Sequence, residues 1–294
     1  MTEKLPVLHN IFNLFEDNVK EYIFNDYDRY TTKLDLVQES NGVRITLTDA
    51  VYDGENITIA YIIDSAHDLR EEPLIYSEPY LFKELDVLSE NQLIKKLGDH
   101  KYAGLSMLNI LNGNRPDTID FTWDATSIYS RFDNNIETKG NWSFEFTLDK
   151  VDSEVHQFKN VGTKGDGFEV KIKNITTTPI STSIYFIGKA NIHAKEWIEE
   201  NWITVFYDFE ITDNLSNKYT VVSSSLYGGN IGGQHGRVIT TEIDENATSI
   251  TVTPIVTVFK EMENQNPSEP GVELESAKPP LSQLKYLLNS HRRL

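Results

Sequence analysis

The segment Asn41–Asp64, NGVRITLTDAVYDGENITIAYIID, constrains the fold more than any other part of the chain. Apolar residues occupy every second position on both sides of a short break, at Val43, Ile45, Leu47, Ile57, Ile59, Tyr61 and Ile63. Alternation with period two is typical of β-strands that turn one face to a core. Asp53-Gly54, in the break, tolerates the positive φ of a tight turn. The segment therefore predicts a β-hairpin with Ile45 and Ile59 directed inward.

The hairpin pattern returns later in the chain. A shift of 125 residues places Asn41 on Asp166 and carries both strands with it. The apolar positions of the second copy are Phe168, Val170, Ile172, Ile184 and Phe186. A constant offset without a gap across two strands indicates a duplicated unit.

Other runs with period two predict further strands, at Ile119–Trp123, Trp142–Leu148, Ile203–Ile211, Tyr219–Val221 and Ile250–Val252. Pro254 follows the last run and predicts an edge position or a bulge, because proline cannot donate to a β-ladder. Many short strands separated by turns favour paired antiparallel sheets, that is, β-sandwiches. A chain of 294 residues is long enough for two such domains. We predict an all-β fold with sandwich domains at residues 30–150 and 151–262.

Four segments favour helix instead. Residues 5–25 are amphipathic and predict an N-terminal helix within residues 1–29. This helix is either a juxtamembrane or partner-binding helix or one that packs against the first domain. Ser89–Gly98 begins with a capping box and ends at a glycine, which predicts a short helix. Ala194–Asn201 predicts a helical turn that carries Trp197. Residues 263–294 predict a proline-rich linker followed by a short helix at the spaced leucines of 281–288.

Composition excludes several classes of function. The net charge of −18, from 45 acidic and 27 basic residues, disfavours nucleic acid and anionic lipid as ligands. The chain has no cysteine, so disulfides, cysteine-containing metal sites and a cysteine nucleophile are excluded. This absence fits the outside of a Gram-positive cell, although a cytosolic protein could share it. The sequence shows neither a signal peptide nor an apolar run of about 18 to 20 residues.

No motif predicts a catalytic, cofactor-binding or metal-binding residue. The seven histidines never reach a metal-ligand spacing. Asp213–Asn217 and Asp133–Asn135 come nearest to a calcium loop, but hairpin loops rich in Asp and Asn explain both more simply. Carboxylate pairs such as Glu71-Glu72 and Glu199-Glu200 could serve a glycosidase only if the fold brought them close to another acid. The four tryptophans, at 123, 142, 197 and 202, favour core packing over a sugar-binding surface.

The glycine-rich segment Gly228–Gly236 is the candidate for partner binding. A phosphate-binding loop is excluded, because no Lys-Ser/Thr follows and the next residues resemble a strand. We predict a hairpin loop, and such loops often carry binding residues on a rigid scaffold. The predicted contact residues are Gly228, Gly229, Asn230, Gly232, Gly233, Gln234 and His235, with the strand edges near Pro254 as a second candidate.

The N-terminal part resembles a known bacterial family. The residues that carry the resemblance are Leu5-Pro6-Val7, Ile11-Phe12, Tyr30, Asn41-Gly42-Val43, Val51-Tyr52-Asp53-Gly54 and Ile59-Ala60-Tyr61. In this order they are similar to the domain of unknown function 4179, seen mainly in Bacillus-like Firmicutes. The second half is similar to the immunoglobulin-like domain that often follows it. The resemblance implies two tandem immunoglobulin-like antiparallel β-sandwiches and brings no catalytic residues.

Family members typically carry one transmembrane helix just before the Pro-Val segment, and some are negative effectors of extracytoplasmic-function sigma factors. The resemblance therefore implies a non-enzymatic, extracytoplasmic sensing or binding region of a membrane-anchored protein, with its anchor upstream of this chain. The partner would be an envelope protein or a cell-wall ligand. A structural or adhesive surface module is the first alternative, and a cell-wall or sugar-active enzyme is the second.

Overall fold

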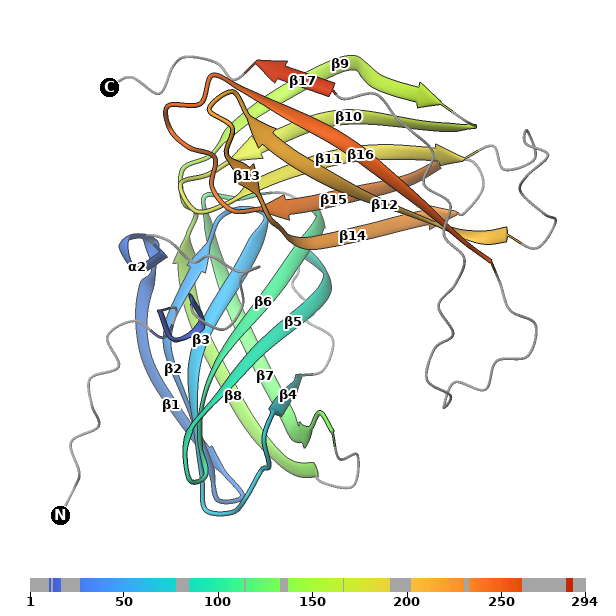
Figure 1. The fold of residues 1–294 in the computed structure, drawn as a ribbon. Coiled ribbons are helices and arrows are strands. Elements are labelled where there is room, and N and C mark those ends of the chain that lie inside the picture. The colour runs from blue at the N-terminus through green and yellow to red at the C-terminus, as the bar shows by residue number, and fades with distance from the viewer. Residues whose placement is uncertain are drawn as a thin grey trace. The chain divides into compact units, whose positions relative to one another are not determined.

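The computed structural model describes residues 11, 13–16, 27–77, 85–113, 115–132, 137–165, 167–190, 202–229, 233–260 and 284–287 (Figure 1). The described part is all-β, apart from the helical turns α1 (Asn13–Glu16) and α2 (Tyr27–Tyr30). The chain divides into two compact units, unit 1 at Met1–Ser153 and unit 2 at Glu154–Leu294. Within the described ranges, no helix has the length and apolar character needed to cross a bilayer.

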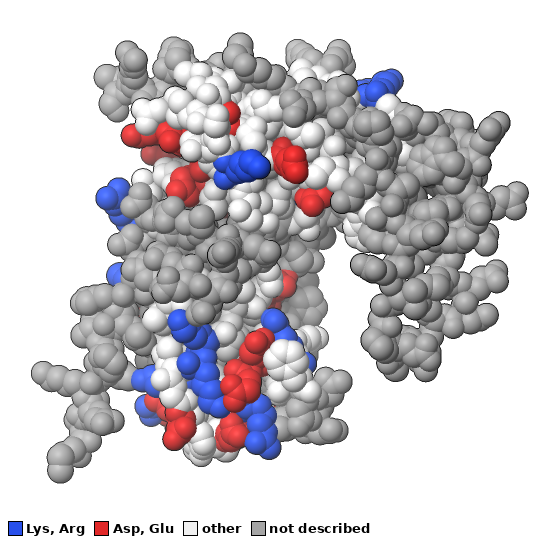
Figure 2. All heavy atoms as spheres, viewed as in Figure 1, with Lys and Arg blue, Asp and Glu red and all other residues white. Residues whose placement is uncertain are grey.

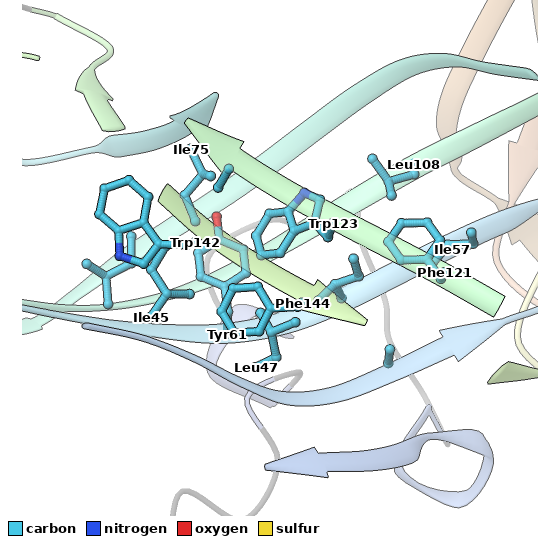
Figure 3. Packing of buried hydrophobic residues seen from close by; sticks show 14 of the residues in the cluster. Ile45, Leu47, Ile57, Tyr61, Ile75, Leu108, Phe121, Trp123, Trp142 and Phe144 are labelled. Carbon is cyan, nitrogen blue, oxygen red and sulfur yellow. The ribbon is translucent and has the colours of Figure 1, made fainter. Parts of the chain in front are cut away.

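Unit 1 consists of two antiparallel sheets. Its strands are β1 (Thr32–Ser40), β2 (Val43–Tyr52), β3 (Asn56–Ser65), β4 (Pro73–Ser77), β5 (Leu85–Gly98), β6 (Lys101–Gly113), β7 (Thr118–Ser130) and β8 (Glu137–Asp149). One sheet has the order β1-β2-β3-β6-β5, and the other has the order β4-β7-β8. Both sheets contribute to one hydrophobic core, in which Ile45, Trp123 and Trp142 are fully buried (Figure 3). Ile59 is fully buried in the same core. The predicted inward direction of the hairpin side chains is confirmed.

Side chains tie the two sheets of unit 1 together at both sides. On the β1 side, the Trp142 indole N–H donates to the Val43 carbonyl at 2.9 Å, and the Asn41 amide donates to the Lys139 carbonyl at 2.6 Å. On the β5 side, the Gln92 amide accepts from the Ile75 N–H at 2.9 Å and donates to the Ile75 carbonyl at 2.6 Å. The Gln92 side chain thus makes the two hydrogen bonds with Ile75 that the backbone of a neighbouring strand would otherwise make.

Unit 2 is built in the same manner. Its strands are β9 (Glu154–Gly165), β10 (Phe168–Thr177), β11 (Thr182–Ala190), β12 (Trp202–Asp213), β13 (Lys218–Tyr219), β14 (Val221–Gly229), β15 (Gly233–Thr240), β16 (Ser249–Lys260) and β17 (Leu284–Leu287). They form the sheets β9-β10-β11-β15-β14 and β13-β12-β16-β17. Phe186, Tyr207, Phe209 and Val256 belong to the core that these two sheets share.

The two units share one strand order. Replacing β1, β2, β3, β6 and β5 by β9, β10, β11, β15 and β14 converts the first large sheet into the second, and β12-β16-β17 corresponds to β4-β7-β8. The hairpins agree residue by residue, because the shift of 125 residues turns the pair Val43↔Ser65 into Phe168↔Ala190. Even the irregularity between Leu47 and Asp49 recurs, between Ile172 and Asn174. The predicted duplication is confirmed, and among the described strands only β13 has no counterpart.

The turn of each hairpin is stabilised in the same way, by a side-chain oxygen that accepts hydrogen bonds from two backbone N–H groups. In unit 1, the Asp53 carboxylate accepts from the N–H groups of Glu55 at 2.8 Å and Asn56 at 2.6 Å. At the shifted position in unit 2, the Thr178 hydroxyl accepts from the N–H groups of Ile180 at 3.2 Å and Ser181 at 2.9 Å. An oxygen at the first turn position satisfies two backbone donors in both copies, which confirms the turn predicted at Asp53.

Each unit also packs a core aromatic ring on a glycine of the neighbouring strand. Tyr61 of β3 lies opposite Gly104 of β6, and Phe186 of β11 lies opposite Gly236 of β15. A Cβ atom on either glycine would lie 2.2 Å from the Cζ atom of the ring. Gly236, which the sequence places in a glycine-rich loop, is therefore explained by packing.

The helix predicted at Ser89–Gly98 is wrong, since these residues belong to β5. A capping box contributes only about 1 kcal/mol, and it depends on local contacts. In the structure β5 instead pairs with β6 from Leu85↔Gly113 to Gly98↔Lys101. The backbone groups that a helix would have used are needed in this ladder, so long-range pairing overrides the local signal.

The C-terminal helix prediction is also wrong for Leu284–Leu287, which form β17 against Ser249–Val252 of β16. The leucine pattern covers only about two helical turns, and a helix that short is marginal by itself. Pro254 lies opposite Phe209 of β12, beyond the residues that β17 pairs with. Among the described strands it therefore has one neighbour, as predicted for an edge position.

Other predicted helical segments lie largely outside the described residues. Of residues 5–25 the structure describes Ile11 and Asn13–Glu16, where α1 forms a single turn, so the long N-terminal helix is not shown. Ala194–Asn201 lies wholly outside the described part, as do residues 263–283.

Candidate binding surfaces of the two units

The segment Gly228–Gly236, predicted from the sequence as a partner-binding loop, consists mostly of the ends of two paired strands. Gly228 and Gly229 end β14, whereas Gly233, Gln234 and His235 begin β15, and Gly228 pairs with Gln234. Gln234 is buried and His235 is half-buried. Asn230 and Gly232 lie outside the described residues. The part available to a partner is thus shorter than the sequence suggests, and a partner role for this hairpin stays a prediction.

The Asp213 turn has its acidic oxygens occupied by hydrogen bonds. The Asp213 carboxylate accepts from the N–H groups of Leu215 and Asn217 at 2.8 and 2.9 Å, from the Asn217 amide at 2.8 Å and from the Tyr219 hydroxyl at 2.7 Å. Burial raises the pKa of Asp213, but the hydrogen bonds from Tyr219 and Asn217 outweigh it and leave this pKa below its usual value. The geometry is that of a turn held by a carboxylate. Among the described residues, no group of three acidic or histidine side chains is arranged to hold a metal.

The carboxylates of Glu71 and Glu72 are used in separate ion pairs. Glu71 contacts Lys96 at 3.0 Å and Glu72 contacts Arg131 at 3.1 Å. Figure 2 shows basic and acidic side chains side by side over the lower part of unit 1. Pairs this exposed add little to stability, because solvent screens the attraction between the charges. Glu199-Glu200 lies outside the described residues, and the full burial of Trp123 and Trp142 confirms their predicted core role.

A cluster of charged residues lies near Tyr52, the last residue of β2, which forms a β-bridge with Lys150 close to the C-terminal end of unit 1. The Lys150 ammonium contacts Asp117 at 2.7 Å, which lowers the pKa of Asp117, and it also donates to the Arg115 carbonyl at 2.9 Å. Arg115 in turn lies 3.5 Å from Glu55. Burial raises the pKa of the neighbouring Tyr52 hydroxyl to about 12. The charged groups are paired with one another, so this cluster fixes the end of unit 1 and offers little to a ligand.

The exposed face of the β7–β8 ribbon carries an ordered array of acids and hydroxyls. From Thr118 to Asp124 of β7 and from Ser143 to Asp149 of β8, every outward side chain is exposed: Thr118, Asp120, Thr122, Asp124, Ser143, Glu145, Thr147 and Asp149. We call these eight residues the acid–hydroxyl face. In the register of the two strands, each acid lies opposite a hydroxyl. Thr118 donates to Asp149 at 2.8 Å, Thr147 donates to Asp120 at 2.8 Å, and Ser143 donates to Asp124.

The acid–hydroxyl face is a regular set of hydrogen-bond acceptors. Neighbouring positions along a strand repeat at about 6.7 Å, and opposite positions lie roughly 4.5–5.5 Å apart. A carboxylate can accept about four hydrogen bonds, so the hydroxyl partner leaves acceptor capacity facing outward. Tyr76 of β4, half-exposed, lies opposite Ser127 of β7 and extends the sheet with an aromatic ring. The sequence patterns at Ile119–Trp123 and Trp142–Leu148 predict the two strands but not how their residues pair.

The opposite sheet of unit 1 carries the N-terminal segment. Ile11 and Phe15 are buried, and the Lys95 ammonium of β5 donates to the Leu14 carbonyl at 2.9 Å. Ile94 packs on the core, so the adjacent Lys95 points to the outer face of the sheet. We call Ile11 together with α1 the N-terminal strap.

The favourable and unfavourable contributions to the free energy of docking the strap are similar in size. Burying two apolar side chains contributes about 1.5–3 kcal/mol each, and a hydrogen bond from a charged group adds about 1.5–3 kcal/mol. Ordering five residues costs about 1–2 kcal/mol for each backbone unit. The terms nearly cancel, so the strap is held far less firmly than the core strands.

Each unit contains a segment that matches a family model. Residues 1–65, which include the strap and β1 to β3, match the domain of unknown function DUF4179. The predicted resemblance is confirmed. Residues 154–278 match a family of unknown function, DUF5643, and this match begins at the first residue of unit 2. No protein with a curated description matches the sequence.

A solved structure shares the fold. The conserved domain protein from Bacillus anthracis has a TM-score of 0.76 and 24% sequence identity, with 97% of this chain and 100% of that chain covered. At this identity the likeness shows the fold alone. Collagen adhesin from S. aureus, at 12% identity over 85% of this chain and 94% of that chain, has a TM-score of only 0.14.

Proposed function

We propose that this chain is a non-enzymatic, extracytoplasmic binding region of a membrane-anchored protein, built from two immunoglobulin-like sandwiches. The observation that supports the proposal is the acid–hydroxyl face. Its side chains stand on paired strands of a rigid sheet and are oriented by hydrogen bonds to one another. Polar groups that are ordered before binding lose little entropy when a ligand arrives. A surface of this kind suits recognition of an extended ligand.

The chemistry of the acid–hydroxyl face suggests a ligand that is rich in hydrogen-bond donors. Its eight side chains include four acids and no base, so it attracts hydroxyl and amino groups and repels phosphate and nucleic acid. Polysaccharides of the cell wall present such donors at regular intervals along a chain. The exposed Tyr76 beside the ribbon could lie against the apolar side of a sugar ring. We therefore propose a cell-wall glycan as the ligand of unit 1.

The test compares two variants with equal changes in charge. In the face variant, Asp120→Asn, Asp124→Asn, Glu145→Gln and Asp149→Asn remove four charges from the acid–hydroxyl face. In the control variant, Asp35→Asn, Glu39→Gln, Asp64→Asn and Asp99→Asn remove four charges from exposed acids elsewhere on unit 1. Co-sedimentation with isolated cell walls should fall at least tenfold for the face variant only. Equal sedimentation of both variants would end the proposal for this face.

The regulatory form of the proposal, a negative effector of an extracytoplasmic-function sigma factor, comes from the family resemblance. Its test is a reporter for that sigma factor, measured in cells with and without the region equivalent to this chain. A reporter that responds to deletion and to the face variant supports ligand-controlled regulation. Wall binding without any change in the reporter would favour a structural or adhesive module. Release of soluble sugar from cell walls by the purified protein would instead support the alternative that the protein is a cell-wall or sugar-active enzyme.

A further inference from the structure

The outer face of the large sheet in unit 1 has an apolar strip that the core does not use. Ala60 of β3 and Leu93 of β5 lie on either side of Leu105 of β6 in the sheet register. Ala60, Ala103 and Leu105 are fully buried, yet none of the three belongs to the core cluster. We call Ala60, Leu93, Ala103 and Leu105 the outer strip. Apolar side chains on the face opposite a core need a cover of their own.

The N-terminal strap lies on this same face. Lys95, whose ammonium binds the Leu14 carbonyl, is paired with Ala103 and is two residues from Leu93. The strap turns back on itself through the Leu14 N–H, which donates to the Ile11 carbonyl at 3.0 Å. This turn directs two buried apolar side chains, Ile11 and Phe15, at the protein. The strap is therefore attached by two apolar anchors and one described hydrogen bond to β5.

Unit 2 shows that the fold does not require an apolar strip at these positions. By the register of the two sheets, Tyr185, Ser225 and Arg237 stand where unit 1 has Ala60, Leu93 and Leu105. Arg237 is buried there, with its guanidinium 5.9 Å from the centre of the Tyr185 ring. The second copy thus accommodates a charge at the central position. The apolar strip is specific to unit 1, the unit that has the strap.

We propose that the outer strip is a docking site for the N-terminal strap and that the strap detaches from it as a switch. A single helical turn is too short to be stable alone, so it forms on the sheet and is lost when it leaves. Detachment exposes the strip while the two-sheet core stays intact. The position of the N-terminus is thereby linked to the exposure of an apolar surface on unit 1. This inference is independent of the ligand proposed for the acid–hydroxyl face.

The experiment uses the full chain and a labelled peptide that spans residues 8–18. Phe15→Asp removes one anchor, so the docking site becomes free for the peptide. Val37→Asp is the matched control, because Val37 is an exposed apolar residue on β1. Fluorescence anisotropy should show at least tenfold tighter peptide binding to Phe15→Asp than to the unaltered chain or to Val37→Asp. A peptide that itself carries Phe15→Asp should not bind.

Two further measurements separate a detachable strap from a structural one. Hydrogen exchange should leave the amides of the β2–β3 hairpin as protected in Phe15→Asp as in the unaltered chain. Adding Leu105→Arg, which copies the residue of unit 2, should abolish peptide binding without loss of this protection. Loss of hairpin protection in Phe15→Asp would show that the strap is part of the core fold and would overturn the proposal. Equal peptide binding to all variants would overturn it as well.

Discussion

The glycine under Tyr61 offers a sharp test of how the sheets pack. Gly104→Ala places a Cβ atom 2.2 Å from Cζ and 2.3 Å from Cε2 of the tyrosine ring, well inside van der Waals contact. The ring cannot easily move, because Tyr61 is fully buried and lies 5.8 Å from the Trp123 ring. Its hydroxyl also donates to the Gln92 side chain at 3.2 Å. The added methyl group therefore has to displace core atoms.

The cost follows from these contacts. Overpacking a buried site costs about 1–3 kcal/mol, and loss of the tyrosine hydrogen bond adds about 0.5–1.5 kcal/mol. We expect Gly104→Ala to destabilise unit 1 by about 2–4 kcal/mol. Gly98→Ala in β5 is the control, because no described atom lies within 4 Å of its added Cβ. The control should change stability by less than about 1 kcal/mol, in either direction.

Hydrogen exchange of the full chain can locate the effect in one unit. Gly104→Ala should weaken protection in the β2–β3 hairpin, and Gly236→Ala should do the same in the β10–β11 hairpin through Phe186. Combining Gly104→Ala with Tyr61→Leu should cost less than the sum of the two changes, because the smaller side chain makes room. The reasoning is refuted if Gly104→Ala unfolds like Gly98→Ala, or if each change weakens both hairpins equally.

Three further perturbations test the hairpin register, the sheet-to-sheet tie and the acidic turn. Ile45→Asp buries a charge in the core and should cost more than about 4 kcal/mol in urea unfolding; a midpoint like that of the unaltered chain would contradict the register. Gln92→Leu leaves the Ile75 backbone groups unpaired and should cost about 1–3 kcal/mol, with faster exchange confined to β4 and β5; unchanged exchange there would contradict the tie. The folded pKa of Asp213 is lowered, so its carboxylate stabilises unit 2 fully above the unfolded pKa of about 3.9, and this contribution is lost as the pH falls through the folded value. Asp213→Asn should therefore reduce the acid dependence of the unit 2 unfolding midpoint, and an unchanged pH profile would show that the carboxylate is not stabilising.

Local signals made the hairpins predictable. Period two at Val43–Leu47 and the oxygen at Asp53 act over a few residues, so the sequence contains all the information that the turn and the strands need. The duplication was visible for the same reason. The inward residues of two equivalent hairpins must both fit a core, which keeps the apolar pattern at a constant offset.

Pairing partners distant in sequence could not be predicted in the same way. Ser89–Gly98 has a good local helix start, and only the presence of β6 beside it makes it a strand. The acid–hydroxyl face has the same origin, because Asp120 and Thr147 become neighbours only in the final register of β7 and β8. After Ala125 the register shifts by one residue, from Ala125↔Trp142 to Ser127↔Lys139, and the strand patterns in the sequence do not reveal this shift.

Comparison of the two copies shows which positions of the shared fold differ between the units. The cross-strand ion pair Arg44–Glu39 recurs in unit 2 as Glu169–Lys164 with the charges exchanged, since either direction satisfies the same attraction. Inward positions keep their apolar character because they share a core. Outward positions are free of that constraint, and there the copies diverge. The strand of unit 2 equivalent to β7 is β16, whose outward residues are Thr251, Thr253, Ile255 and Thr257. β16 has hydroxyls but no acid there, and the exposed acids Asp208 and Glu210 of this sheet lie on β12, opposite Ile255 and Thr253. Between β16 and β17, the strand equivalent to β8, Thr251 lies opposite Lys285, so the acid–hydroxyl pairs of β7 and β8 are not repeated there.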